Sequence, residues 1–369
     1  MKERETHHPA KRQLWAERRR AFGPKAISLS RDGLVKTGAL PPGGTLPLVL
    51  QPGAEGINLT DWAANNRAFI ESKLLVHGGL LFRGFDLETQ EDMEWFLDSI
   101  SLRPMHYMEG ATPRTELSAK VYTSTEYPPE QGIALHNELN YVISWPLKII
   151  FFALKPALRG GETPIADVRN VFNRIPAKIR ERFIEKGWML VRNFGDGMSL
   201  PWQRSFRVKT REELEDYCRR SRVEFEWKGN DRLRTRQVRP AVRRHPVTGE
   251  CLWFNHIAFW HVSSLDKEIR ELFLPKFKQE DLPYNTYYGD GSPIEDEVVE
   301  QLRQAYDQET VAFRWHKGDL LLMDNMLAAH GRNPFEGPRR VLVSMGDPYS
   351  DYVPDVGFKL DAANHPGGE

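Results

Sequence analysis

Short apolar stretches separated by turn residues recur along the chain from about residue 45 onward. Leu80 to Phe85 predicts a strand that closes near a glycine, and Val341 to Met345 predicts the last clear strand. Leu147 to Leu154 is a mostly apolar run between two prolines, which is typical of a buried strand. Groups of strands with helices between them predict a mainly β chain with helical insertions around a β-barrel-like or jelly-roll core.

Helix signals are clearest where a capping residue precedes a helical pattern. Thr89 with Asp92 predicts the start of one helix, and Thr210 with Glu213 predicts a capping box for another. Ser292-Pro293-Ile-Glu predicts a third helix, with proline at its first position. These helices do not alternate regularly with strands, which argues against a doubly wound α/β fold.

The turn cluster Pro41-Pro-Gly-Gly44 suggests where the compact part of the chain begins. Residues 1–44 are therefore predicted to be an N-terminal basic extension, and residues 45–369 a single domain. Within that domain, residues from about 168 to 262 are predicted to form a largely helical and arginine-rich insertion.

The composition narrows the class of protein. The 369 residues are 40% hydrophobic and 28% charged with a formal net charge of zero, which is typical of a globular domain and argues against a nucleic-acid partner. Two cysteines cannot build a disulfide framework or a thiolate zinc site. No apolar run approaches the roughly 20 residues of a membrane span, and the first residues lack a signal-peptide core. We expect a cytoplasmic protein without membrane contact.

A candidate metal site lies in His136-Asn137-Glu138, on a predicted strand. Side chains at positions i and i+2 of a strand share a face, so His136 and Glu138 can reach one ion. Two histidines and one carboxylate on one face of an octahedron form the triad of iron(II) oxygenases. His330, which follows the apolar segment from Leu320 and precedes Gly331, is the best candidate for the second histidine.

Four segments in the same order resemble the taurine/2-oxoglutarate dioxygenase superfamily, which includes the clavaminate synthase-like enzymes. Within it, the chain is most similar to the syringomycin-type hydroxylases that modify amino acids during nonribosomal peptide synthesis. The resemblance extends from about residue 45 to 350. The four segments are Tyr122-Thr-Ser-Thr-Glu-Tyr-Pro-Pro, Ala134-Leu-His-Asn-Glu-Leu-Asn-Tyr141, Gly160-Gly-Glu-Thr-Pro-Ile-Ala-Asp167 and His330-Gly-Arg-Asn-Pro-Phe-Glu-Gly-Pro-Arg-Arg340.

The resemblance implies a double-stranded β-helix (jelly-roll) core and an Fe(II) ion held by His136, Glu138 and His330. It also implies 2-oxoglutarate as cosubstrate and O2 as oxidant. Many members carry aspartate where this chain has Glu138. The branches that use glutamate act on amino-acid-like substrates, and a retained carboxylate favours oxygenation over halogenation.

The far carboxylate of 2-oxoglutarate needs a fixed cation, and a guanidinium can bind it with two hydrogen bonds. Arg339 and Arg340 both follow His330 at a suitable distance along the chain. The resemblance favours Arg340, with Arg339 structural or exposed. It also assigns Thr163 to the same carboxylate.

Candidate substrate residues lie in the aromatic segment from Trp253 to His261. Asn255 and His256 could face the substrate, and packing in an aromatic core explains the segment equally well. A second metal pair of His256 with His261 is disfavoured because no carboxylate lies among them.

A run of arginines without intervening acids forms a possible partner surface. Arg232, Arg234 and Arg236 alternate and would share one face of a strand. A solvated face is the simplest interpretation. Arg234 and Arg236 could instead dock an acidic carrier protein or bind the carboxylate of a free amino acid. The full run is Arg232, Arg234, Arg236, Arg239, Arg243 and Arg244.

These observations predict a 2-oxoglutarate-dependent dioxygenase that hydroxylates an unactivated C–H bond of an amino acid or a carrier-tethered aminoacyl group in natural-product biosynthesis. A catabolic dioxygenase of a small sulfonated or carboxylated acid is the alternative within the class. A zinc hydrolase using the same triad is an alternative from another class, but it leaves Thr163 and Arg340 without a role. A binding module without catalytic activity is disfavoured by the intact triad.

Overall fold

The computed structural model describes residues 33–351, apart from short gaps. The predicted N-terminal extension up to residue 32 lies outside the described part. The gaps are residues 41–43, 106, 111–113, 196–198, 230, 266–267, 269, 272–273 and 277.

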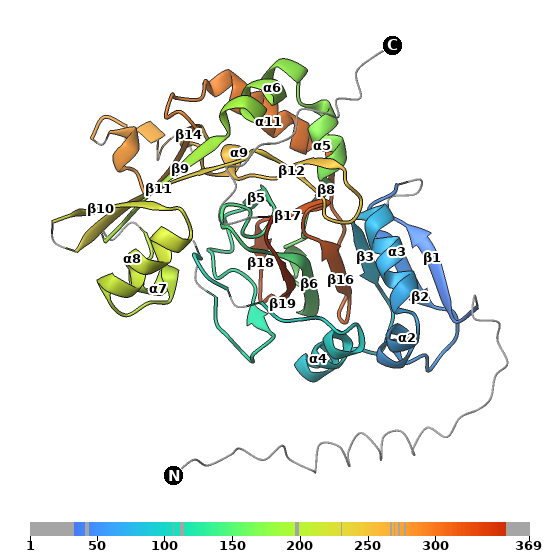
Figure 1. The fold of residues 1–369 in the computed structure, drawn as a ribbon. Helices are drawn as coiled ribbons and strands as arrows, with labels where there is room; N and C mark the ends of the chain where they lie inside the picture. Colours follow the sequence, from blue (N-terminus) through green and yellow to red (C-terminus); the bar gives the residue numbers. More distant parts are fainter. Residues whose placement is uncertain are drawn as a thin grey trace, which may run out of the picture.

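The largest sheet has seven strands and forms one wall of the core (Figure 1). Its two longest strands, β6 and β19, pair along most of their length. The pairing is antiparallel throughout except between β2 and β3. The strand order is β1 (Val35–Ala39), β2 (Leu48–Pro52), β3 (Gly79–Phe82), β16 (Leu320–Asp324), β6 (Trp145–Lys155), β19 (Arg340–Tyr349), β4 (Tyr122–Thr123).

A smaller sheet faces the inner side of the large one and carries two of the candidate metal ligands. The two sheets meet where the ring of Phe151 on β6 lies 5.0 Å from the ring of His330 on β17. Two short strands, β7 (Arg159–Gly160) and β18 (Phe335–Glu336), pair separately beside them. The order in the smaller sheet is β15 (Thr310–Val311), β8 (Ile165–Asp167), β17 (Ala328–Arg332), β5 (Ile133–His136).

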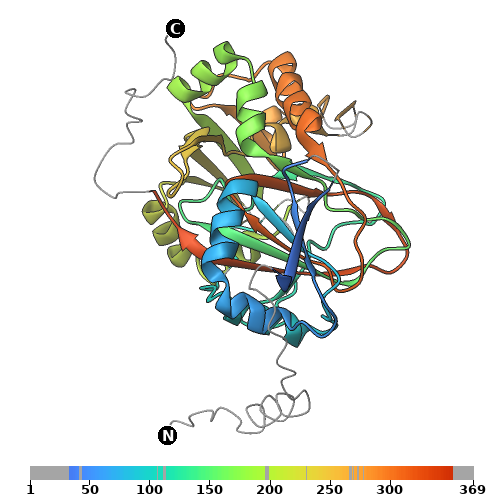
Figure 2. The same cartoon turned by 90° about the vertical axis from the view of Figure 1, so that its right-hand side faces the viewer.

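Both faces of β6 are buried, which explains why its sequence is apolar almost without interruption. Phe151 and Ala153 point between the two sheets, whereas Ile150 and Phe152 point outward into a second apolar cluster. Helices cover that outer face, and Figure 2 shows the blue ones lying across the strands. They are α2 (Leu59–Asn65), α3 (Arg67–His77) and α4 (Gln90–Ser99).

A second group of strands and helices packs beside the two facing sheets, mostly within residues 168–309. Its four-stranded sheet has the order β10 (Glu224–Lys228), β11 (Arg232–Arg239), β9 (Trp188–Phe194), β14 (Tyr284–Tyr288). A hairpin is formed by β12 (Val242–Arg244) and β13 (Cys251–Trp253). The helices are α5 (Val168–Arg174), α6 (Ala177–Lys186), α7 (Trp202–Phe206), α8 (Arg211–Arg220), α9 (Ile257–Trp260) and α11 (Asp296–Glu309).

The expected mainly β architecture with helical additions is confirmed, with local differences. Residues 35–39 fall in the predicted N-terminal extension but form the edge strand β1. The region 168–262 is less helical than expected, because it contains strands β9 to β13 besides its helices. Its alternating arginines lie on β11, which pairs on both sides.

Two of the three helix starts agree with the sequence. The capping boxes of α4 and α8 form as predicted. Helix α11 begins at Asp296 rather than at Pro293, so proline is not its first residue. In the described part of the chain, no helix is long and apolar enough to cross a bilayer.

The packing of β6 against the helices can be tested with Phe152→Ala. Phe152 is fully buried, so its truncation should lower the free energy of unfolding by about 3–5 kcal/mol. Phe69→Ala removes the same side chain from a partly exposed position on α3 and should cost about 1 kcal/mol or less. Urea unfolding of both variants measures the difference, and equal costs would contradict the described packing.

Candidate active site

The three predicted metal ligands come together. His136 ends β5 and is the direct cross-strand partner of His330 on β17, so the two rings lie 4.5 Å apart between centroids. Nε2 of His330 lies 3.8 Å from Oε2 of Glu138. One ligand atom from each of the three residues lies within 4.8 Å of the others.

Glu138 reaches the site by a different route from the one expected. Strand β5 ends at His136, and Glu138 lies in the turn that follows, so strand periodicity does not orient it. Asn325 fixes this turn instead: its Oδ1 accepts from the Glu138 amide at 2.7 Å, and its Nδ2 donates to the Glu138 carbonyl at 2.9 Å. Asn137 donates in turn to the Asn325 carbonyl at 2.6 Å. The side chain of Asn325 therefore clamps the backbone of Glu138.

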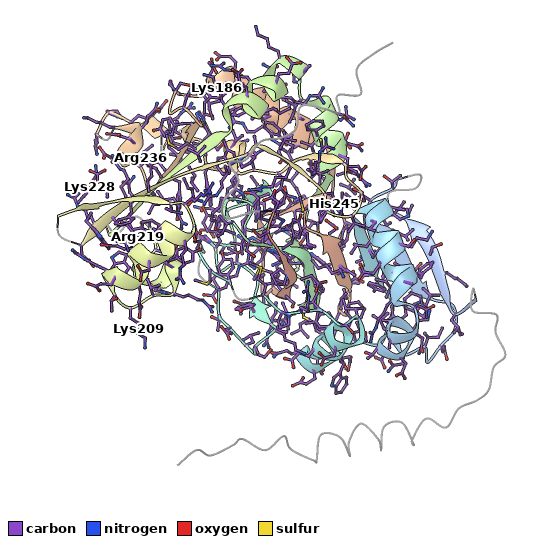
Figure 3. All side chains as sticks on the ribbon, in the orientation of Figure 1. Lys186, Lys209, Arg219, Lys228, Arg236 and His245 are labelled. Atoms are coloured by element: carbon purple, nitrogen blue, oxygen red, sulfur yellow. The ribbon has the colours of Figure 1, made fainter. Side chains whose placement is uncertain are left out.

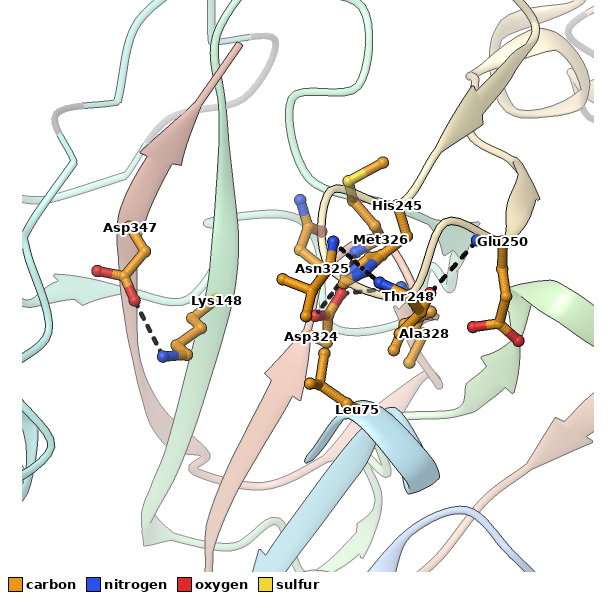
Figure 4. Close-up of polar contacts among 12 residues, drawn as sticks. Leu75, Lys148, His245, Thr248, Glu250, Asp324, Asn325, Met326, Ala328 and Asp347 are labelled. Atoms are coloured by element: carbon orange, nitrogen blue, oxygen red, sulfur yellow. Dashed lines mark hydrogen bonds and ion pairs between the residues drawn. The ribbon is translucent and has the colours of Figure 1, made fainter. Parts of the chain in front are cut away.

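Asp324, the neighbour of Asn325, ties the turn between β16 and β17 to the β12–β13 hairpin (Figure 4). Its Oδ1 accepts from the amides of Met326 and Leu327 at 2.9 and 3.0 Å. Its Oδ2 lies 3.0 Å from Nε2 of His245, whose Nδ1 accepts from the amide of Thr248. Since Nδ1 accepts, Nε2 carries the proton and donates to Asp324. The turn that leads into β17 and His330 is held from two sides.

The protonation states suit metal binding. Desolvation, followed by the proximity of His330, lowers the pKa of His136 to about 3, so its imidazole is neutral near pH 7. The Nδ1 of His136 lies 2.9 Å from the carbonyl of Ala134, which leaves Nε2 for a metal. Burial acts to raise the pKa of Glu138, but Arg114 and the two histidines outweigh it and hold that pKa below its ordinary value. Two imidazoles and one carboxylate are a donor set that fits iron(II).

Arg114 is a site residue that no sequence pattern indicated. Its Nη2 donates to Oε2 of Glu138 at 2.7 Å, and the two side chains are only 4% and 5% exposed. Arg114 precedes His136 by 22 residues and belongs to no recognisable motif. Only the folded chain shows that this guanidinium neutralises the carboxylate of the candidate metal site.

Aromatic side chains form one wall of the site. The ring of His136 lies 4.8 Å from Phe259 and 5.6 Å from His256. His256, a predicted substrate residue, is therefore adjacent to the metal ligands, and its Nδ1 hydrogen-bonds with Oδ1 of Asn140. Asn255 is placed differently, because it donates to the carbonyl of Ala241 and accepts from the amide of Ile257. Its polar atoms serve the local backbone.

The two arginines considered for the cosubstrate have the opposite placement to the one expected. Arg340 is exposed. It lies opposite Lys155 in the β19–β6 ladder, at a bulge that shifts the strand register before Val341. Arg339 is partly buried and donates through Nε to the carbonyl of Gly161 at 3.0 Å. Desolvation, with Arg332 nearby, lowers the pKa of Arg339 to about 10. The bulge therefore leaves Arg340, rather than Arg339, in solvent.

Thr163 lies two residues after the glycine that Arg339 contacts. It is buried, and its Oγ1 accepts from the indole Nε1 of Trp315 at 3.2 Å. Among the described residues, Arg339 forms no ion pair with a carboxylate of the protein. The buried hydroxyl of Thr163 thus lies on the segment that Arg339, which forms no ion pair in the described part of the chain, contacts through Gly161.

Arg234 and Arg236 share a face of β11, as predicted, but only one is accessible. Arg234 is 2% exposed, donates to Asn193 at 2.9 Å and forms ion pairs with Glu280 and Asp281. Arg236 is 31% exposed and lies 3.5 Å from Glu226. Figure 3 shows Arg236 at the periphery of the molecule, beside β11. Arg234 is a structural residue, and the docking interpretation is restricted to Arg236.

Comparison with known proteins identifies relatives along most of the chain. The family described as taurine catabolism dioxygenase TauD, TfdA family matches residues 44–345. The dapdiamide synthesis protein DdaC of Enterobacter agglomerans is 39% identical over 279 residues, covering 76% of this chain and 85% of that protein. A clavaminate synthase-like protein of Arabidopsis thaliana is 29% identical over 315 residues, covering 83% of this chain and 91% of that protein.

Solved structures share the fold at lower identity. PvcB of Pseudomonas aeruginosa, described as an Fe, alpha-ketoglutarate dependent oxygenase, is 18% identical with a TM-score of 0.51, covering 88% of this chain and 95% of that chain. A taurine dioxygenase of Burkholderia xenovorans is 17% identical with a TM-score of 0.51, covering 86% of this chain and 92% of that chain. The family match removes the zinc hydrolase alternative. The chain belongs to the TauD/TfdA family and is an Fe(II)- and 2-oxoglutarate-dependent dioxygenase that uses O2.

Proposed function

We propose that the enzyme hydroxylates an unactivated C–H bond of an amino acid, free or tethered to a carrier protein, in natural-product biosynthesis. The observation that carries the proposal is the cluster of His136, Glu138 and His330 within a chain that is 39% identical to a dapdiamide synthesis protein. That similarity favours a biosynthetic role over the catabolic alternative. Glutamate in the triad agrees with an amino-acid-like substrate.

The proposed architecture is a double-stranded β-helix whose two layers are the seven-stranded sheet and the smaller sheet. The pairing of β17 with both β5 and β8 supports this interpretation, because it places His136 and His330 on adjacent strands of one layer. The opposite layer supplies Phe151, which packs on His330. The metal ligands would then lie between the layers.

His136 through Nε2, His330 through Nε2 and Glu138 through a carboxylate oxygen would hold the Fe(II) ion. With 2-oxoglutarate and O2 bound, this centre supplies the oxidant that removes hydrogen from a substrate carbon and returns a hydroxyl group. The protein positions that carbon and excludes water. Phe259, His256 and the residues packed on them form the wall that does so.

Arg339 and Thr163 would bind the far carboxylate of 2-oxoglutarate, with Arg339 taking the role that the sequence assigned to Arg340. A partly buried guanidinium beside Gly161 is better placed for this than an exposed one. Thr163 adds a hydroxyl from the same segment. The guanidinium supplies charge-assisted hydrogen bonds, which are stronger than neutral ones.

The metal assignment predicts a visible charge-transfer band when the protein is titrated anaerobically with Fe(II) and then 2-oxoglutarate. His330→Ala should abolish the band, because two remaining ligands cannot hold the metal in a facial triad. His316→Ala changes an exposed histidine away from the cluster and should leave the band intact. A protein that forms no band would contradict the assignment.

The cosubstrate assignment predicts different effects at two neighbouring positions. Arg339→Gln should raise the Kd of 2-oxoglutarate by about 10- to 100-fold, because hydrogen bonds to charged groups contribute about 1.5–3 kcal/mol. Arg340→Gln should change it by less than about threefold, as expected for an exposed charge. Titration of the same charge-transfer band measures both values. The opposite ranking would restore Arg340 as the anchor.

The roles of Arg234 and Arg236 on β11 can also be distinguished by substituting each one. Arg234→Gln should lower the free energy of unfolding by about 1–3 kcal/mol, since it leaves Asn193 and two carboxylates without their buried partner. Arg236→Gln should change it by less than about 0.5 kcal/mol. Urea unfolding measures both free energies.

If Arg236 docks a carrier protein, Arg236→Glu should raise the KM of a carrier-tethered substrate and not that of a free one. An unchanged KM would remove this docking role.

A further inference from the structure

The turn that carries Glu138, residues 138–141, contains a strained residue. Leu139 has a φ of 55°, in the left-handed region that residues with a side chain rarely adopt. A conformation of this kind is unfavourable by itself and persists only where surrounding contacts enforce it. Asn325 holds the first residue of the turn, Glu138. The contacts that hold the rest of the turn therefore also bear on where the carboxylate of Glu138 lies.

The far end of the turn is held by the sheet of β10, β11, β9 and β14. On β11, Nε2 of Gln237 donates to the carbonyl of Tyr141 at 2.7 Å, and Nε of Arg239 donates to the same carbonyl at 2.9 Å. Both side chains are buried. A carbonyl oxygen has two lone pairs, so these two donors satisfy it. The backbone of Tyr141 is thereby fixed relative to β11.

A third contact holds the middle of the turn. Nδ1 of His256, the N-cap residue of α9, donates to Oδ1 of Asn140, because an amide oxygen can only accept. The ring of His256 packs on Trp260 at 4.4 Å and on Tyr141 at 5.3 Å between centroids. Asn140 is fully buried. Two successive residues of the turn are thus held by side chains of the second group of strands and helices.

The two donors on β11 lie on the face of the strand opposite to Arg234 and Arg236. Successive side chains of a strand alternate between its faces, so positions 237 and 239 face away from positions 234 and 236. One face carries Arg236, which is partly exposed. The other face carries Gln237 and Arg239 to the Glu138 turn. The arginine run of β11 is therefore divided between two surroundings.

We propose that Gln237 and Arg239 are positioning residues that set the metal affinity of the site through the Glu138 turn. The inference rests on the proposed metal ligands and gives β11 a part in building the metal site. Both donors fix Tyr141, and the strained turn between Tyr141 and Glu138 keeps the carboxylate in place. Without a donor on Tyr141, the turn can relax in the metal-free protein and has to re-form when the metal binds, which weakens binding.

The test measures metal affinity in Gln237→Met, which keeps a side chain of similar length but removes the donor. Gln237 is the better position to change, because Arg239 also donates to the carbonyls of Ser221 and Arg222. Co(II) is titrated into the metal-free full-length protein in competition with a chromophoric chelator. Its Kd should rise about three- to tenfold, as expected for the loss of one hydrogen bond. An unchanged Kd overturns the proposal.

Asn193→Leu is the matched control for a merely structural effect. Asn193 lies opposite Arg234 on the neighbouring strand β9 and donates to the carbonyls of Glu280 and Leu282 at 2.9 and 2.7 Å. Urea unfolding should show at least as large a loss of stability as in Gln237→Met, whereas the Kd of Co(II) should stay within about twofold. An equal loss of metal affinity in both variants would point to general destabilisation and overturn the proposal.

Amide hydrogen exchange reports directly on the turn. In the metal-free protein, a peptide spanning residues 137–142 should exchange faster in Gln237→Met than in the wild type, and at the wild-type rate in Asn193→Leu. Exchange that stays unchanged in Gln237→Met contradicts the proposed relaxation. If Gln237→Met does not fold, Gln237→Asn, which withdraws the amide by one carbon, has the same expected results in all three measurements.

The outcomes separate this inference from the function on which it rests. A wild-type protein that binds Co(II), loses it in His330→Ala and keeps its affinity in Gln237→Met rejects the inference alone. A wild-type protein that neither binds Co(II) nor forms the charge-transfer band with Fe(II) and 2-oxoglutarate rejects the metal site, and the inference with it.

Discussion

The buried carboxylate of Glu138 is the constraint around which the site is built. A carboxylate removed from water tends to take up a proton, which would make it a poor metal ligand. Arg114 counters this with a direct charge-assisted hydrogen bond. Asn325 holds the backbone on both sides of the same residue through its amide and its carbonyl. The charge of Glu138 is thus controlled by Arg114 and its position by Asn325, two side chains from distant parts of the sequence.

The second determinant is β17, which places His330. It pairs with β5 on one side, opposite His136, and with β8 on the other. The turn before β17 contains Asp324 and Asn325, so the residues that clamp Glu138 also set the start of the strand that carries His330. A change in this turn would affect all three ligands together.

Much of the site could be predicted from the sequence because its ligands occur in short, recognisable segments. His136, Glu138 and His330 were predicted in this way, and the folded chain brings them together. The orientation of Glu138 was wrong in detail, because a two-residue period assumes a strand and β5 ends at His136. The mainly β fold and two capping boxes followed from local patterns, which depend on neighbouring residues alone.

The remaining features depend on contacts that no local pattern records. Strand β19 is buried on both faces, so its sequence does not distinguish the inward side, and beside a bulge Arg339 is partly buried whereas Arg340 is exposed. Arg234 looked accessible because its acidic partners lie more than 40 residues further along the chain. Arg114 was missed altogether, since an arginine outside a motif carries no signal of its partner.

The added sheet has a consequence for how such an enzyme can diversify. The candidate metal ligands come from the smaller of the two facing sheets and from the turn after β5. The segment leading to Arg114 is held instead by β9 and α8: Arg192 donates to the carbonyl of Glu109, and Tyr217 to its carboxylate. Helices α7 and α9 of the same unit supply further walls. Substitutions in α7 and α9 can reshape these walls without replacing a metal-site residue, whereas changes in β9 or α8 also reach Arg114 and through it Glu138.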